Sequence, residues 1–155
     1  MPLNHVFPFL QRKLLYSVIC LLIIFNLGCK TQQISPDKYA GYQIRFGQGG
    51  GFAGLKTEYA ILENGHYFKQ AAGKDSFEYV NRFEKQFVEQ MISNVDFLKL
   101  DEMKINHPGD LYFFVEFKDG PNSKRLVWGK ADVETAESLK AFYRILYSSV
   151  KNDLK

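Results

Sequence analysis

The sequence predicts an α+β fold, an antiparallel sheet of four to six strands with two helices packed on one face. Short segments in which apolar and polar residues alternate are typical of half-buried strands. Two longer segments repeat their apolar residues at helical spacing. Asn64-Gly65 separates two strand-like segments and indicates a tight hairpin. The predicted order is strand, strand, helix, strand, strand, helix.

Length and composition point to one packed domain. The chain has 155 residues, of which 46% are hydrophobic and 14 are Phe. This is enough to form a core, and it excludes a disordered chain. The net charge of +3 includes Arg12 and Lys13, which lie in a segment that we expect to be removed. The remaining charge of about +1 gives no indication of nucleic-acid binding.

Residues 1–28 have the pattern of a secretory signal peptide. The basic pair Arg12-Lys13 precedes the apolar segment 14–27, which ends at Gly28-Cys29. This apolar segment is shorter than the roughly 20 residues that a membrane-spanning helix needs. We therefore expect cleavage before Cys29, with an uncleaved membrane anchor and a freely secreted form as the alternatives.

The residues around Cys29 resemble the lipobox of bacterial lipoproteins. Gly28 and Cys29 match that pattern, whereas Asn26 and Leu27 do not occupy the usual Leu and small-residue positions. The resemblance implies lipidation of Cys29, and several acyl chains on one residue give stable membrane anchoring. Lys30, rather than Asp, follows Cys29 and favours transport to the outer membrane of the cell envelope. Which side of that membrane the protein faces is left open.

The rest of the chain divides into a tether and one domain. Residues 29–38 are predicted to be the lipidated cysteine and a polar tether, and residues 39–155 a single α+β domain. Residues 30–155 contain no Cys, which excludes a disulfide framework and a thiol nucleophile from the mature chain. The domain must therefore be stabilised by its core.

The elements before residue 100 follow from these patterns. Strands are expected at 42–46, 56–62 and 66–70, and a further short extended piece at 76–80. A helix is predicted from 82 to 94, because Phe83, Phe87 and Met91 recur at helical spacing. Asn81, with Glu84 three residues later, is expected to cap it.

The same kinds of pattern predict the elements after residue 100. Residues 104–110 are predicted to be a loop, since Pro108 lacks a backbone donor. Strands at 111–117 and 124–129 follow, and the last helix is expected from 133 to 150, with Asp132 as its N-cap.

The segment "GQGGGFAGL", 47–55, carries the most distinctive pattern. Gly49, Gly51 and Gly54 have the G-x-G-x-x-G spacing of a dinucleotide site. Such a site requires a helix directly after the third glycine, but a strand-like segment and a hairpin turn follow here. We therefore exclude phosphate binding and expect no cofactor. Two interpretations remain: a wide connection between the first two strands, or a loop that presents Phe52 to a protein partner.

The glycine-rich segment also carries a family resemblance. Gly50-Gly51-Phe52-Ala53-Gly54 lies between two strands, and a helix, the segment "PGDLYFFVEF", the strand "RLVWG" and a last helix follow. This arrangement, over about residues 41–148, resembles the emfourin family, small α+β proteins that inhibit thermolysin-like metalloproteases. Asp110 and Tyr112 fit the resemblance too. The resemblance implies protease binding through the loop around Phe52. The chain departs from the family in its lipid signal and in its hairpin at Asn64-Gly65.

The strand 111–117 carries aromatic residues on both faces. Alternation places Phe113 towards the helices and Tyr112 and Phe114 on the opposite face, whereas Trp128 in the next strand fits either face. Together on that opposite face, Tyr112, Phe114 and Trp128 would form an exposed aromatic binding patch. The alternative is that residues 96–109 fold over this face and cover it.

The sequence contains no recognisable catalytic motif. His66 and His107 lie far apart and are expected at the surface, without the spacing of a zinc site. No serine lies in a G-x-S-x-G segment. We therefore expect a lipid-anchored binding protein rather than an enzyme, one that restrains a metalloprotease through Phe52 and Asp110. The alternative is a structural or assembly lipoprotein that docks another envelope protein through the aromatic sheet face.

Overall fold

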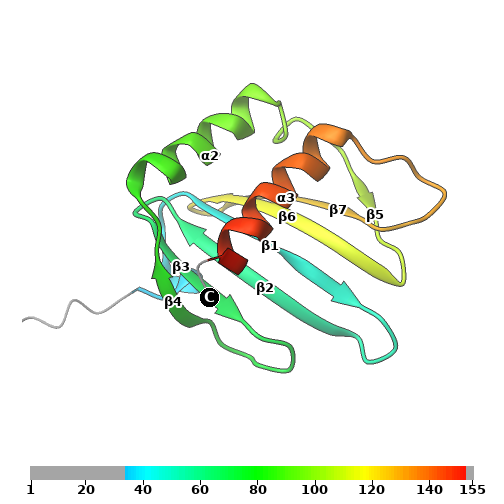
Figure 1. Cartoon of the computed structure of the whole chain (residues 1–155), viewed down its shortest axis with the longest axis horizontal. Coiled ribbons are helices and arrows are strands. Elements are labelled where there is room, and N and C mark those ends of the chain that lie inside the picture. The colour runs from blue at the N-terminus through cyan, green and yellow to red at the C-terminus, as the bar shows by residue number, and fades with distance from the viewer. Residues whose placement is uncertain (1–33, 153–155) are drawn as a thin grey trace, which may run out of the picture. The chain divides into compact units, whose positions relative to one another are not determined.

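The computed structural model describes residues 34–152, which belong to a compact unit that begins at Ile34. A seven-stranded sheet has the order β4-β3-β2-β1-β6-β7-β5, with helices α2 and α3 on the same side of it (Figure 1). The strands are β1 (Gln43–Gly50), β2 (Leu55–Leu62), β3 (His66–Gln70), β4 (Glu78–Arg82), β5 (Asn106–His107), β6 (Leu111–Asp119) and β7 (Asn122–Trp128). The helices are the 3₁₀ turn η1 (Pro36–Lys38), α2 (Lys85–Phe97) and α3 (Glu137–Asn152).

The α+β class is confirmed, but the predicted sheet was too small and too regular. The sheet has seven strands instead of four to six, and it is mixed because β5 runs parallel to β7. The Val127 amide donates to the Ile105 carbonyl (3.0 Å), and the Lys130 amide donates to the His107 carbonyl (3.1 Å). Part of the predicted 104–110 loop therefore pairs with the sheet edge. Two residues are too few to show an alternating pattern.

Both predicted helices exist but begin later than expected. Asn81 does not cap α2, because it lies in β4 and pairs with Tyr67. Glu84 occupies the N-cap position instead, without a side-chain capping bond. Asp132 does not cap α3 either, since that helix begins at Glu137. In both cases the chain needs the extra residues to pass from the sheet to its helix-covered face.

The helix-covered face carries the main apolar core. Alternate residues of the central strands point towards the helices, among them Ile44 and Phe46 in β1 and Val115 in β6. Fully burying one such side chain contributes roughly 1.5–3 kcal/mol. The helices supply the residues that pack against them, namely Val88, Met91, Val95, Leu139, Phe142, Leu146 and Val150.

The opposite face of the sheet is buried at its centre by polar contacts. Arg45 is 8% exposed, and its guanidinium lies 3.1 Å from an Asp37 carboxylate oxygen and 3.8 Å from Glu58 Oε1. The Gln43 side chain donates to the carbonyl of buried Pro36 (3.1 Å). Residues 36–38, predicted as the end of the tether, are therefore part of the domain. That boundary was wrong because these contacts are long-range pairings that the local polar composition does not show.

Two glycines in β1 allow aromatic rings of β6 to lie against the sheet. Gly47 is the register partner of Phe114, and Gly49 is the partner of Tyr112. A β-carbon on Gly47 would lie 3.1 Å from the Phe114 ring, and one on Gly49 would lie 2.6 Å from the Tyr112 hydroxyl oxygen. Glycine within a strand often marks such a close approach. The first part of the glycine-rich segment is thus strand rather than loop.

We predict that Gly47→Ala destabilises the domain by about 1–3 kcal/mol, the usual cost of overpacking a tight site. The added carbon collides with the Thr57 carbonyl oxygen and crowds Phe114, so the sheet has to shift. Urea unfolding measures the change. Gly73→Asn is the control, because nothing lies within 4 Å of a β-carbon there and Asn tolerates positive φ. Equal unfolding free energies for wild type and Gly47→Ala would contradict the packing role.

Candidate functional site

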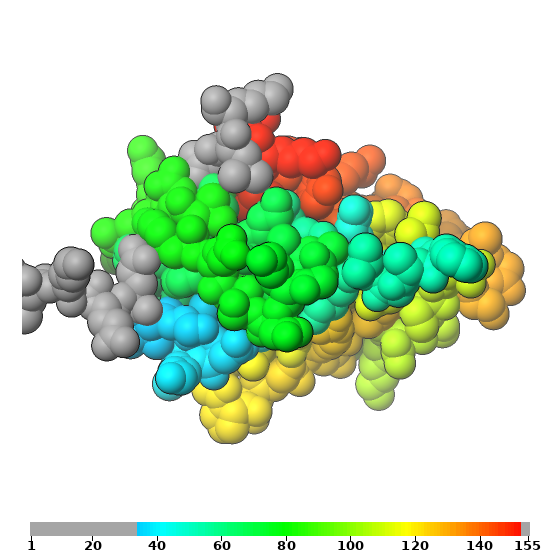
Figure 2. All heavy atoms as spheres, turned by 90° about the horizontal axis from the view of Figure 1, so that it is seen from below, coloured from blue at the N-terminus to red at the C-terminus, as the bar shows by residue number. Residues whose placement is uncertain are grey.

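The connections 51–54, 71–77, 108–110 and 129–136 gather at one end of the sheet. The antiparallel register sets this, because Gly50 at the end of β1 pairs with Leu55, the first residue of β2, and Leu111, the first residue of β6. Figures 1 and 2 show the hairpin around Phe52 at the opposite end of the domain from residues 34–40. The candidate site lies at this hairpin end.

The hairpin between β1 and β2 is short and held by hydrogen bonds. Gly50, Gly51 and Gly54 have φ values of 98°, 74° and 59°, which favour glycine. The Gly54 amide donates to the Gly51 carbonyl (3.0 Å), and the Gly51 amide donates to the Asp110 carbonyl (2.7 Å). The interpretation of a wide connection with glycines at positive φ therefore holds in part: the glycines have positive φ, but the connection is short because strand pairing continues to Gly50. The chain after Gly54 forms β2 rather than a helix, as the rejection of a dinucleotide site requires.

Three exposed apolar side chains surround this hairpin and form what we call the apolar tip: Phe52, Leu55 and Leu111. Phe52 is fully exposed (112%), Leu55 is 51% exposed and Leu111 is 66% exposed. Phe52 thus does not fold back into the core. Grouped exposed apolar residues of this kind mark interaction surfaces. Asp110 joins the tip through its backbone carbonyl, so the structure brings together the two segments that the sequence singled out.

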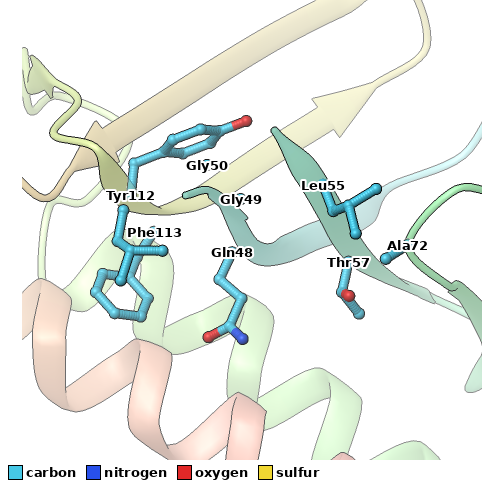
Figure 3. Close-up of a pocket in the computed structure, with 9 residues that line it drawn as sticks. Gln48, Gly49, Gly50, Leu55, Thr57, Ala72, Tyr112 and Phe113 are labelled. Carbon is cyan, nitrogen blue, oxygen red and sulfur yellow. The ribbon is translucent and has the colours of Figure 1, made fainter. Parts of the chain in front are cut away.

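A pocket of about 280 Å³ adjoins the apolar tip. Gln48, Thr57 and Phe113 line it on the helix side of the sheet, together with Leu55 and Leu111 of the tip. Figure 3 shows the Gln48, Thr57 and Phe113 side chains pointing to one side of β1, whereas Tyr112 lies on the other. None of the described residues that line this pocket is charged. Gln48, Thr57, Leu55 and Leu111 were not predicted as site residues. The one indication in the sequence is that Gln48, a polar residue, takes the next position on the strand face that Ile44 and Phe46 occupy.

The aromatic patch expected on the sheet face does not form. Phe114 is on the expected face but is buried, with the Arg125 guanidinium 3.8 Å from its ring centroid. Trp128 lies on the helix side, where it stacks with Phe113 and meets Tyr143 edge-on. The alternative cover is wrong too, because Leu100, within 96–109, joins the helix-side core. Tyr112 is the one member of that patch that stays partly exposed.

Tyr39 and Tyr42, two groups with raised pKa values, lie before β1, at the opposite end of that strand from the tip. Burial, together with a hydrogen bond to Glu63 (2.8 Å), raises the pKa of Tyr39 to about 12. Burial also raises the pKa of Tyr42 to about 12, with added repulsion from nearby aspartates. Within residues 34–152, no group of three or more His, Cys, Asp or Glu side chains could hold a metal ion. The three residues of the apolar tip, Phe52, Leu55 and Leu111, have no ionisable side chain.

Comparisons with known proteins give no assignment. No protein-family model matches the chain. No curated protein matches it either. Cys29 lies outside the described residues. In the described part, neither α2 nor α3 is long and apolar enough to cross a membrane.

We predict that His66 makes the domain less stable in mild acid. Burial, then the nearby positive charge of Arg82, lowers its pKa, and the buried Nδ1 has no hydrogen-bond partner among the described residues. The folded state therefore binds fewer protons than the unfolded state. This difference in proton binding stabilises the folded state at pH values above the unfolded pKa of His66, about 6.5. The stabilisation is lost as the pH falls through the folded pKa of His66.

The melting temperature at about pH 7.5 and about pH 5 measures this effect. His66→Gln should lose less melting temperature between the two pH values than wild type does. His107→Gln, at an exposed histidine, is the control and should behave as wild type. The same acid loss in His66→Gln as in wild type would show that His66 is not responsible.

Proposed function

We propose that this chain is a lipid-anchored protein of the cell envelope that binds a protein partner through its apolar tip. The partner we propose is a thermolysin-like metalloprotease, which the protein restrains by binding. The observation that carries the proposal is the full exposure of Phe52 on a hairpin whose backbone is held in place. An exposed aromatic residue of this kind is a typical anchor of a protein interface.

The fixed hairpin reduces the cost of binding. The bond from the Gly51 amide to the Asp110 carbonyl ties the turn to the segment before β6, and full strand pairing continues to Gly50. A contact residue presented by ordered backbone loses less conformational freedom when its partner docks. Leu55 and Leu111 flank the turn and widen the apolar contact around Phe52.

The position of the tip suits a protein anchored at its N-terminus. The chain enters β1 at Gln43 and reaches the tip at the far end of the strand, at Gly50. Eight strand residues span about 27 Å at roughly 3.4 Å per residue. The tip is therefore well separated from the point where the tether joins the domain. An anchor on lipidated Cys29 would hold the chain at the end of β1 opposite the tip.

The choice of a metalloprotease rests on the emfourin resemblance. Its two parts, Gly50–Gly54 and the segment with Asp110 and Tyr112, are neighbours joined by the Gly51–Asp110 hydrogen bond. This supports a single contact surface made of both. We do not propose docking through the aromatic sheet face, because Phe114 and Trp128 are buried.

We predict that soluble residues 30–155 inhibit a thermolysin-like protease and that Phe52→Ala weakens the inhibition at least tenfold. The loss of a central aromatic anchor typically costs 2 kcal/mol or more, which is about a 30-fold change in affinity. A titration of protease activity gives the inhibition constant. The fragment keeps every described contact, since the compact unit begins at Ile34.

Phe97→Ala is the matched control for this titration. Phe97 is also a strongly exposed phenylalanine (84%), but it lies at the end of α2, away from the tip. Its loss should leave inhibition unchanged. No inhibition by wild type at micromolar concentration, or equal weakening by both variants, would overturn the proposed function.

We predict that Cys29→Ser releases the protein from the membrane fraction, because lipid chains on this sulfur provide the anchor. Cys20→Ser, which changes the other cysteine of the chain, should leave the protein membrane-bound and is the control. Cell fractionation and metabolic labelling with a radioactive fatty acid give the two readouts. Fatty-acid labelling of Cys29→Ser equal to that of wild type would rule out lipidation at this position.

A further inference from the structure

We infer that the pocket beside the apolar tip binds an uncharged, extended peptide segment of the partner. An apolar side chain of that segment fills the pocket, and the Gln48 side-chain amide pairs with the backbone N–H and C=O of one of its residues. This inference rests on the proposed function for the location of the partner. It adds which part of the partner is recognised and by which chemistry.

The size and walls of the pocket fit a side chain. Its volume of about 280 Å³ lies just below the roughly 300–1,000 Å³ typical of small-molecule and cofactor sites. Leu55, Leu111 and Phe113 provide apolar walls from β2 and β6. These walls favour an aliphatic or aromatic side chain, whose burial is stabilised by the loss of apolar surface from water.

The polar groups of the pocket fit a peptide backbone. Gln48 and Thr57 are register partners on β1 and β2, and neither side chain makes a hydrogen bond within the described residues. A Gln amide offers both an N–H donor and a carbonyl acceptor, as a backbone peptide group does. In an extended segment the N–H and C=O of one residue point to the same side, so the Gln48 side chain can accept from that N–H and donate to that C=O. The Thr57 hydroxyl provides a third polar contact.

The absence of charge from the lining selects the class of ligand. A carboxylate, ammonium or phosphate group in this pocket would lose hydration without meeting an opposite charge. A peptide with an uncharged side chain avoids that cost. The ligand class is therefore a neutral polypeptide segment.

The pocket and the tip form one continuous surface. Leu55 and Leu111 belong to both, and Gly50 lies between them in the sheet. Gln48 lies two residues before Gly50 in β1. Its side chain is on the same face as the buried Ile44 and Phe46, but it is exposed. A partner that packs on Phe52 can thus extend one segment into the pocket, where the sheet face rather than a sheet edge receives it.

The test uses ¹⁵N-labelled residues 30–155 and two blocked tripeptides, acetyl-Ala-Leu-Ala and acetyl-Ala-Asp-Ala N-methylamides. The leucine peptide should shift the Gln48 side-chain amide signals saturably at concentrations up to about 10 mM, a range that suits a weak ligand. Gln48→Ala should weaken this binding about tenfold, through the loss of two hydrogen bonds. The aspartate peptide should give no saturable shift.

Gln90→Ala is the matched control, because Gln90 is an exposed glutamine on α2 and should leave peptide binding unchanged. Thr57→Val keeps the shape of the pocket and should weaken binding by less than Gln48→Ala does. No saturable shift with the leucine peptide would overturn the inference. Shifts that follow protein rather than peptide concentration would overturn it too, because a second copy of the chain then occupies the pocket.

These results are separable from the protease titration. Peptide binding without protease inhibition would retain the pocket as a peptide site and reject the metalloprotease as the partner. Protease inhibition without peptide binding would retain the proposed function and reject the role of Gln48.

Discussion

The packing of two β6 rings against two β1 glycines sets the register of the central strand pair, on which the rest of the sheet depends. Phe114 lies beside Gly47 and Tyr112 beside Gly49. A slip by one residue would set Phe114 against Phe46 or Gln48 and turn the apolar residues of β1 away from the helices. The same register brings Gly50 between Leu55 and Leu111. The contact that aligns the core therefore also assembles the apolar tip.

This arrangement gives the two faces of the sheet different means of stabilisation. The helix side is buried by apolar packing that includes both helices. The opposite side is closed at its centre by the ionic contacts of Arg45 with Asp37 and Glu58, and by the Arg125 guanidinium over Phe114. Buried charges are stable only when they are paired, so residues 36–38 are needed where they lie. The region next to the proposed lipid anchor is thus held by electrostatics, far from the tip.

Local patterns predicted most of the elements, and long-range pairing decided the rest. Asn64-Gly65 predicted its hairpin because positive φ at a tight turn is a local requirement, and Gly65 has a φ of 92°. Alternation placed Phe114 on the correct face but could not show that Arg125 would cover it, since that depends on the pairing of β6 with β7. Asn81 has the chemistry of a helix cap, yet pairing with Tyr67 retains it in β4. For the site, the sequence identified the segment around Phe52 but not Gln48 or Leu111, whose proximity exists only in the folded sheet.

The apolar tip is best understood as a surface kept exposed at a cost to the isolated domain. Phe52, Leu55 and Leu111 could each be stabilised by burial, and other loops of the domain carry small or polar residues such as those at 72–75. The backbone prevents burial of Phe52, because the short turn and the bond from Gly51 to Asp110 fix its position at the end of the hairpin. A turn selected for stability alone would not need an aromatic residue there. Ordered backbone, exposed apolar side chains and a pocket whose described lining is uncharged occur together at this one end, and the proposed protein partner would use all three.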